Sequence, residues 1–186
     1  MLKTSFAALT IAFAASAAFS AGHSVENPMV GGAAMFADKN IVENAVNSAD
    51  HTTLVAAVGA AGLVETLQSE GPFTVFAPTN DAFAALPEGT VDSLLLPENK
   101  DLLTTILTCH VVGANAMSDA IAGMIADSNG THAVETLGGC TLQATMTDDM
   151  IQLTDENGTV ATVAIADVVQ SNGVIHVIDA VLTPAM

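Results

Sequence analysis

The second half of the chain constrains the fold most strongly, because five β-rich segments follow one another there with only short turns between them. From residue 131 onward they read THAVETL, CTLQATMT, MIQLTDE, TVATVAIADVVQ and GVIHVIDAVLTP. The pairs between them are Gly-Gly, Asp-Asp, Asn-Gly and Asn-Gly, which are typical of tight turns. In the second segment Cys140, Leu142, Ala144 and Met146 alternate with polar residues, which predicts a half-buried strand.

The first half of the chain has mainly helical periodicity. Apolar residues recur every three or four positions from Asn40, and Gly and Pro residues divide the pattern into short helices. The predicted helices cover residues 40–49, 54–62, 63–67, 79–86, 90–95 and 97–108, with a helical turn over 118–125 and strands at 73–78 and 109–112. Helices early and strands late predict an α+β domain, because alternating βαβ units would mix the two along the chain.

The first residues of the chain have the pattern of a cleaved signal peptide over residues 1–21. Lys3 precedes an apolar run over residues 6–18, and Ala18 and Ser20 supply small residues where a signal peptidase cuts. The run is shorter than the about 20 apolar residues that span a bilayer. We therefore expect an N-terminal arm over residues 22–39 and one soluble domain over residues 40–184, exported from the cytoplasm and without membrane insertion.

The charge of the chain excludes several classes of partner. It has 20 acidic residues against 3 lysines, a formal net charge of −17, and no arginine. Nucleic-acid binding needs basic residues that neutralise phosphates, and an anionic membrane repels such a chain. The acidity indicates a well-solvated surface, with weak capture of divalent cations as the alternative. The sequence DENG at residues 155–158 lacks the alternating oxygen ligands of a calcium-binding EF-hand loop.

The two cysteines, Cys109 and Cys140, are expected to form a disulfide, since paired cysteines are usual in exported proteins. The bridge would close a loop of roughly 30 residues and stabilise the fold by about 3–4 kcal/mol. If TCHVV is a strand, Cys109 and His110 point to opposite faces and form no nucleophile–base pair. A bridged cysteine also has no thiolate.

The sequence contains no recognisable catalytic, metal-binding or cofactor-binding set. His110 and His176 lie in apolar segments, where a single histidine is usually packed with its ring nitrogens hydrogen-bonded. Paired His-x-x-His or Cys-x-x-Cys ligands are missing, as are the serine hydrolase, dinucleotide and phosphate-loop motifs. We therefore predict no catalytic residue, metal or cofactor.

Three motifs in order resemble those of the fasciclin domain family. FTVFAPTNDAF at residues 73–83 resembles the first signature, HVV at 110–112 the middle motif, and SNGVIHVIDAVLTP at 171–184 the second signature. The resemblance extends over about residues 40–184. It implies a wedge of about seven mainly antiparallel strands with several helices, mostly in the N-terminal half. It also implies a non-enzymatic adhesion role outside the cell, and the chain looks most like the single-domain bacterial members.

The resemblance implies three possible adhesion residues. Family members of the animal matrix have an Asp-Ile pair before the second signature, and Asp167 and Val168 occupy that place here. The middle motif usually has Tyr-His, and here Cys109 replaces the tyrosine while His110 remains. We expect Cys109 to be joined to Cys140 so that two β segments lie side by side, with Cα atoms about 5–6 Å apart.

The two signatures also contain residues that we expect to determine the fold. Thr79, Asn80 and Asp81 should fix a strand-to-helix corner by capping. Gly173 should let the chain turn into the last strand. In that strand, His176 and Asp179 are expected to make internal hydrogen bonds.

Two functions remain open at this stage. The leading hypothesis is a secreted or periplasmic adhesion module that binds a cell-surface or matrix protein or a polysaccharide. The alternative is a periplasmic carrier of a small apolar ligand, suggested by the Met- and Ala-rich composition. A dry pocket of about 300 Å³ or more inside the wedge would favour the carrier, and a solid interior would not.

Overall fold

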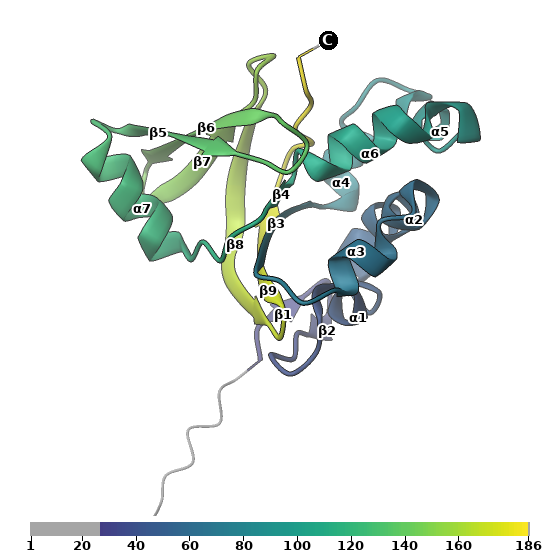
Figure 1. Cartoon of the computed structure of the whole chain (residues 1–186), viewed down its shortest axis with the longest axis horizontal. Helices are drawn as coiled ribbons and strands as arrows, with labels where there is room; N and C mark the ends of the chain where they lie inside the picture. Colours follow the sequence, from purple (N-terminus) through teal and green to yellow (C-terminus); the bar gives the residue numbers. More distant parts are fainter. Residues whose placement is uncertain (1–26, 186) are drawn as a thin grey trace, which may run out of the picture.

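The computed structural model describes residues 27–185, and the predicted signal peptide lies outside the described residues. A seven-stranded sheet runs through the centre, with helices α1 to α6 on one side and α7 on the other (Figure 1). This is the mixed α+β wedge that the sequence predicted. No helix within residues 27–185 is long and apolar enough to cross a membrane.

The sheet has the strand order β4-β3-β9-β8-β7-β6-β5. Only β3 and β9 are parallel, and all other neighbouring pairs are antiparallel. All seven lie within segments predicted as strands from the sequence, although β4 is shorter than its segment. The strands are β3 (Phe73–Pro78), β4 (Val111–Val112), β5 (Thr131–Glu135), β6 (Thr141–Thr147), β7 (Met150–Thr154), β8 (Val160–Gln170) and β9 (Gly173–Ile178).

Most of the helices, α1 to α6, precede strands β4 to β9 in the chain, as predicted. Asn40 and Glu43 form a reciprocal capping box at the start of α1, and Gly62 ends α2 in the left-handed conformation with φ 75°. The helices are α1 (Ile41–Ala45), α2 (Thr52–Ala61), α3 (Val64–Gln68), α4 (Asn80–Ala84), α5 (Thr90–Leu94), α6 (Lys100–Thr108) and α7 (Ser118–Asp127), with 3₁₀ turns η1 (Ala49–His51) and η2 (Pro97–Asn99).

Several helices differ in length from the prediction, and two of the differences have a clear structural cause. The helix expected over residues 40–49 ends at Ala45, because the amides of Asn47 and Ser48 donate to carbonyls three residues earlier instead of four, and the Ala49 amide donates to the carbonyl of Gly31. The segment predicted as a single turn at 118–125 is instead the ten-residue helix α7. Its Ile121 and Ile125 are buried against the sheet, and this tertiary packing sustains the helix.

The segment predicted as an N-terminal arm packs onto the domain over much of its described length. Residues 29–34 form a short hairpin of β1 (Met29–Val30) and β2 (Ala33–Ala34). Val30 and Met35 are buried in the core that the helices share with the sheet. This segment therefore supplies apolar side chains to the fold.

The sheet separates two hydrophobic cores, and the central strands contribute to both. Val75 and Ala77 of β3 belong to the core beneath α1 to α6, whereas Phe76 between them belongs to the core beneath α7. In β9, likewise, Ile175 and Ile178 belong to different cores. Strands buried on both faces read as continuous apolar runs, which explains the sequences FTVFAP and GVIHVI.

Candidate functional site

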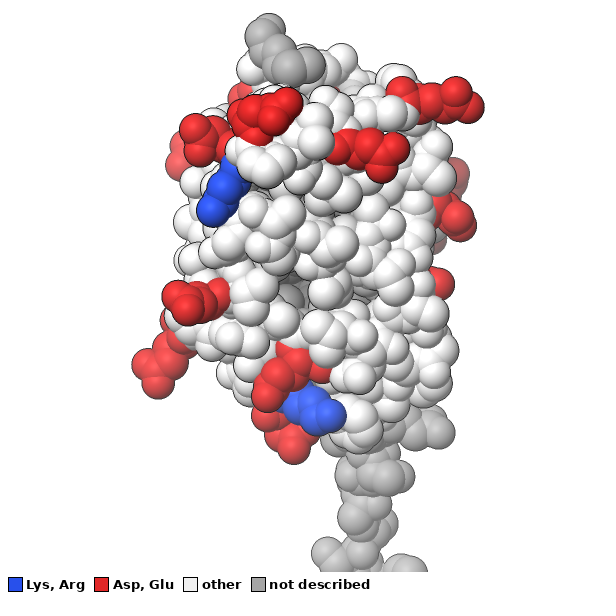
Figure 2. Space-filling view, turned by 90° about the vertical axis from the view of Figure 1, so that its right-hand side faces the viewer, with Lys and Arg blue, Asp and Glu red and all other residues white. Residues whose placement is uncertain are grey.

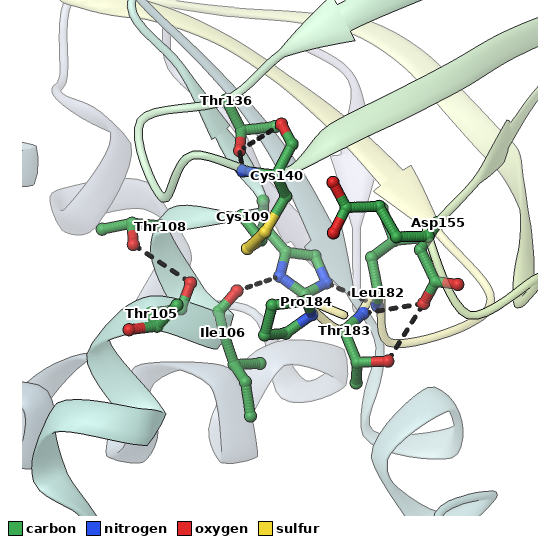
Figure 3. Close-up of a disulfide and its surroundings, with 12 residues drawn as sticks. Thr105, Ile106, Thr108, Cys109, Thr136, Cys140, Asp155, Leu182, Thr183 and Pro184 are labelled. Carbon is green, nitrogen blue, oxygen red and sulfur yellow. Dashed lines mark hydrogen bonds between the residues drawn. A yellow bond between two sulfur atoms is a disulfide. The ribbon is translucent and has the colours of Figure 1, made fainter. Parts of the chain in front are cut away.

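A disulfide joins Cys109 to Cys140, with their Cα atoms 5.3 Å apart (Figure 3). Cys109 is the C-terminal cap of α6, and Cys140 directly precedes β6. The Thr136 hydroxyl accepts from the Cys140 amide at 3.1 Å and donates to its carbonyl at 3.0 Å. The bridge therefore fastens the end of a helix to the start of a strand, and the expectation that it joins two β segments is wrong.

The prediction of a strand over residues 109–112 is also wrong at its first two positions. Cys109 has helical backbone angles, His110 lies in the turn after α6, and only Val111–Val112 form a strand. Strand alternation therefore does not separate the two side chains. The disulfide itself excludes a cysteine nucleophile at this place, since it leaves no thiolate.

His110 is buried and uses both ring nitrogens inside the fold. Nδ1–H donates to the carbonyl of Ile106 at 2.8 Å, and Nε2 accepts from the amide of Leu182 at 2.9 Å. Burial lowers the pKa of His110 to about 4, although the bond to Ile106 and the charge of Asp155 oppose that shift. The ring is therefore neutral and links α6 to the C-terminal segment. Since the side chain is only 2% exposed, its prediction as an adhesion contact is wrong.

Asp155 fastens the same C-terminal segment and was missed as a structural residue by the sequence reasoning. Its Oδ1 accepts from the amides of Asn157 and Thr159. Its Oδ2 accepts from the amide and hydroxyl of Thr183 (Figure 3). Burial raises its pKa, but the bonds from Thr183 and Thr159 outweigh burial and lower the pKa overall. The signal in the sequence was Asp-x-Asn-Gly, in which Asp commonly bonds the backbone two residues later.

Asp167 is positioned by an irregularity in β8, and its carboxylate is hydrogen-bonded within the fold. The register against β9 shifts between Ile165 and Val168, and Asp167 has a φ of 58°. Its carboxylate accepts from the amide of Ser118 at 2.7 Å and also from the Ser118 hydroxyl. It thereby supplies a cap to the first turn of α7, whose own N-cap side chain makes none. Val168 is fully buried, so its prediction as a contact residue is wrong.

His176 of β9 completes this arrangement from the other side. Its Nδ1 accepts from the amide of Asp167 at 3.2 Å, and its Nε2–H donates to the carbonyl of Ala116 at 2.8 Å. The ring stacks on Phe76 with 5.6 Å between the ring centroids, and burial lowers its pKa. His176 is thus a packed, neutral histidine with both nitrogens bonded.

The three residues of the first signature divide their capping between two helices. Thr79 caps α4 by accepting from the amide of Ala82 at 3.3 Å. Asn80 instead accepts from the Thr53 amide at 3.0 Å, in the first turn of α2, and donates to a carbonyl of η1. Asp81 is exposed in the first turn of α4. We expected all three residues to cap one strand-to-helix corner. Thr79 caps α4 there, whereas Asn80 bonds α2 and η1 instead.

Gly173 and Asp179 lie at the two ends of β9. A Cβ atom on Gly173 would lie 2.0 Å from the carbonyl oxygen of Phe73, so glycine is required for the close approach of β3 and β9. Gly173 also directly follows the turn at residues 171–172, and its expected role in that turn stays a prediction. Asp179 accepts from the amide of Thr162 at 2.6 Å and so connects the end of β9 to β8.

An apolar cavity of about 380 Å³ lies between the helical layer and the edge of the sheet. Its walls come from α1, α2, α3, α6, β3 and β4. Aliphatic side chains such as Val42, Leu54, Val58 and Leu67 make up most of the lining. The interior of the wedge is therefore not solid on its helical side.

Comparison with known proteins identifies the family. The model of the fasciclin domain matches residues 49–184. Protein sll1483 of the cyanobacterium Synechocystis is 49% identical over 161 residues, which is 87% of this chain and 82% of that protein. The transforming growth factor-beta-induced protein ig-h3 of the pig is 39% identical over 131 residues, which is 70% of this chain but only 17% of that protein.

A solved structure with the same fold is the domain pair from the insect cell adhesion molecule fasciclin I. The TM-score is 0.56 at 24% sequence identity, and the match covers 70% of this chain and 43% of that one. The family model and the cyanobacterial relative each cover well over half of this sequence. The chain therefore belongs to the fasciclin domain family.

Proposed function

We propose that the chain is an exported, non-enzymatic adhesion module that binds a cell-surface or matrix protein or a polysaccharide. The fasciclin domain match over residues 49–184 is the observation that carries this proposal. The solved domain pair with the same fold comes from a cell adhesion molecule. The predicted signal peptide at residues 1–21 supports a place outside the cytoplasm, in the periplasm or beyond the cell.

The internal bonding of the candidate chemical groups supports a non-enzymatic role. His110 and His176 each have both ring nitrogens in hydrogen bonds within the fold. Burial holds the pKa of each ring below its usual value, and the two cysteines are joined in a disulfide. These groups stabilise the domain, and the partner is recognised by its outer surface.

The charge of that surface indicates which partners it favours. Acidic side chains lie mostly around the edge of the helical face (Figure 2), and Lys39 and Lys100 are the lysines within residues 27–185. Anionic polymers are repelled by such a surface at low ionic strength. We therefore expect binding to neutral polysaccharides or to basic protein surfaces rather than to sulfated or phosphorylated ones.

Beads coated with the purified mature chain test the adhesion proposal. They should attach to immobilised cell-wall polysaccharide or matrix protein, and free folded chain should compete for attachment whereas heat-unfolded chain should not. Deleting the gene from the producing organism should reduce surface attachment and aggregation, and re-expression should restore both. Unchanged attachment in the deletion strain, together with no capture by the beads, would refute the proposal.

A second candidate function, a carrier of a small apolar molecule, is favoured by the cavity of about 380 Å³. That volume lies within the range of small-molecule sites in proteins, which are mostly apolar. The neutral dye Nile red tests this function because its fluorescence rises in apolar surroundings. We expect saturable binding of one dye per chain, and no binding would reject the carrier.

A further inference from the structure

The walls of the helical-side cavity offer a buried ligand almost no hydrogen-bonding partner. Only Gln68 and His110 among the lining residues have polar side chains. Both ring nitrogens of His110 are already bonded, to Ile106 and Leu182, so the ring presents carbon to the cavity. A polar group carried into the interior would lose its hydrogen bonds to water without replacement. The ligand must therefore be hydrocarbon over most of its length.

The mouth of the cavity is formed by residues of the helical face. Three exposed residues also line the cavity: Val46 after α1, Gly59 of α2 and Gln68 of α3. The space-filling view of this face shows a hollow near its centre, with charged side chains mostly around the edge (Figure 2). Gln68 is the residue there whose amide can bond a polar end of a ligand.

The distribution of charge excludes an anionic end. Lys39 and Lys100 are the basic residues within residues 27–185, and neither lines the cavity. A carboxylate head group at the mouth would have no cationic partner there and would meet the field of a chain with net charge −17. No carboxylate side chain lines the cavity either, so a cationic head group also lacks a partner.

We propose that this cavity binds one neutral, hydrocarbon-rich molecule, whose apolar body lies among α1, α2 and α3 and whose single uncharged polar end lies at Gln68. The proposal rests on the carrier function above and adds the place and the chemical class of the ligand. Apolar cavities hold water poorly and accept apolar molecules of matching size.

A matched pair of probes tests the chemical class. Purified chain with Nile red bound is titrated with 1-dodecanol and with dodecanoate at pH 8, which have the same chain length and differ in the head group. We expect dodecanol to displace the dye and raise the melting temperature, and dodecanoate to bind at least about tenfold more weakly. Equal binding of the two overturns the proposed class while the carrier function stands, whereas no binding of Nile red rejects the carrier function itself.

Two glycines provide a matched pair of variants that tests the place. Gly59 in α2 and Gly123 in α7 are both exposed helical glycines, and a Cβ added to either meets no atom within 4 Å. Leucine at either position improves helix propensity, so both variants should fold. Gly59→Leu should weaken dodecanol binding at least about tenfold by filling the mouth, and Gly123→Leu should leave it unchanged.

A third variant adds bulk from another helix that lines the same cavity. Ala45→Leu, from α1, should also weaken dodecanol binding, with circular dichroism and the melting temperature reporting whether the fold is kept. Binding that survives both Gly59→Leu and Ala45→Leu in folded protein, or that falls equally with Gly123→Leu, overturns this location.

Discussion

Protonation of His110 should weaken the fold as the pH falls from 6.5 to about 4. The pKa of this histidine is about 4 in the folded chain against an ordinary 6.5. Above pH 6.5 the ring is neutral in both states, so stability is complete there. Below it, the unfolded chain takes up a proton that the folded chain refuses, and the free energy of unfolding falls until the pH reaches the folded pKa.

The structure gives the size of this loss and its cause. The gap between the two pKa values, at about 1.4 kcal/mol for each pH unit, amounts to about 3 kcal/mol. A protonated Nε2 would point an N–H at the amide of Leu182, which is itself a donor, so that bond would have to break. Asp155 stays ionised through most of this window because its folded pKa is lowered, and its own contribution is lost only at still lower pH.

The assay compares the parent with His110→Gln by urea unfolding at several pH values from 7 to 4.5. Far-UV circular dichroism is the signal, since the chain has no Trp or Tyr. The variant should be about 1–3 kcal/mol less stable at pH 7. As the pH falls, the free energy of unfolding of the variant should decrease less steeply than that of the parent. Near pH 5 the difference between the two slopes should approach the slope that uptake of one proton produces. His51 and His176, whose pKa values burial also lowers, contribute equally to both proteins.

A control separates titration from general weakening. Val111→Ala removes buried apolar volume beside His110 without changing a titratable group, and should cost about 1–3 kcal/mol at every pH. Its pH dependence should match that of the parent. Parallel pH curves for the parent and His110→Gln would refute the assignment of His110 as a buried neutral ring.

Three further predictions concern stability. Replacing Cys109 and Cys140 together with alanine should lower the free energy of unfolding by about 3–4 kcal/mol, because the bridge spans 31 residues; denaturant titration measures it, and an unchanged midpoint contradicts the loop-closure argument. Gly173→Ala should lower the free energy of unfolding by more than about 3 kcal/mol, because the added Cβ clashes with the backbone of β3. Gly59→Ala should raise it by up to about 1 kcal/mol. Melting temperatures that move in the same direction in both variants would contradict this pair of predictions. Asn80→Ala should cost about 1–3 kcal/mol and expose the first turn of α2 to hydrogen exchange, while unchanged exchange there would count against its capping role.

The sequence predicted the elements whose signals are local. Strand β3 ends at Pro78 and helix α2 ends before Gly62, as the residue types at those positions indicate. The disulfide between Cys109 and Cys140 was predicted from cysteine number and an inferred oxidising compartment. Each of these inferences needs only the identity of neighbouring residues or the number of cysteines in the chain.

The remaining features depend on contacts between distant segments. After α1 the Ala49 amide bonds the distant carbonyl of Gly31, and the role of Asn80 depends on helix α2 lying beside it. Val168 was expected at a contact surface. Instead it follows the bulge at Asp167 and is buried in the core between the sheet and the helices. The apolar cavity results from how four helices pack against the sheet. The distance between those helices and the sheet cannot be predicted from the periodicity of the sequence.

The position of β9 governs when this polypeptide can fold during synthesis. The last strand of this sheet to be synthesised, β9, is inserted inside the sheet between β3 and β8, and it pairs Phe73 with Gly173. A nascent chain that lacks it has two open strand edges, and neither core can close. Such distant pairings also form slowly. The sheet should therefore stay incomplete, and the domain unfolded, until β9 has been synthesised.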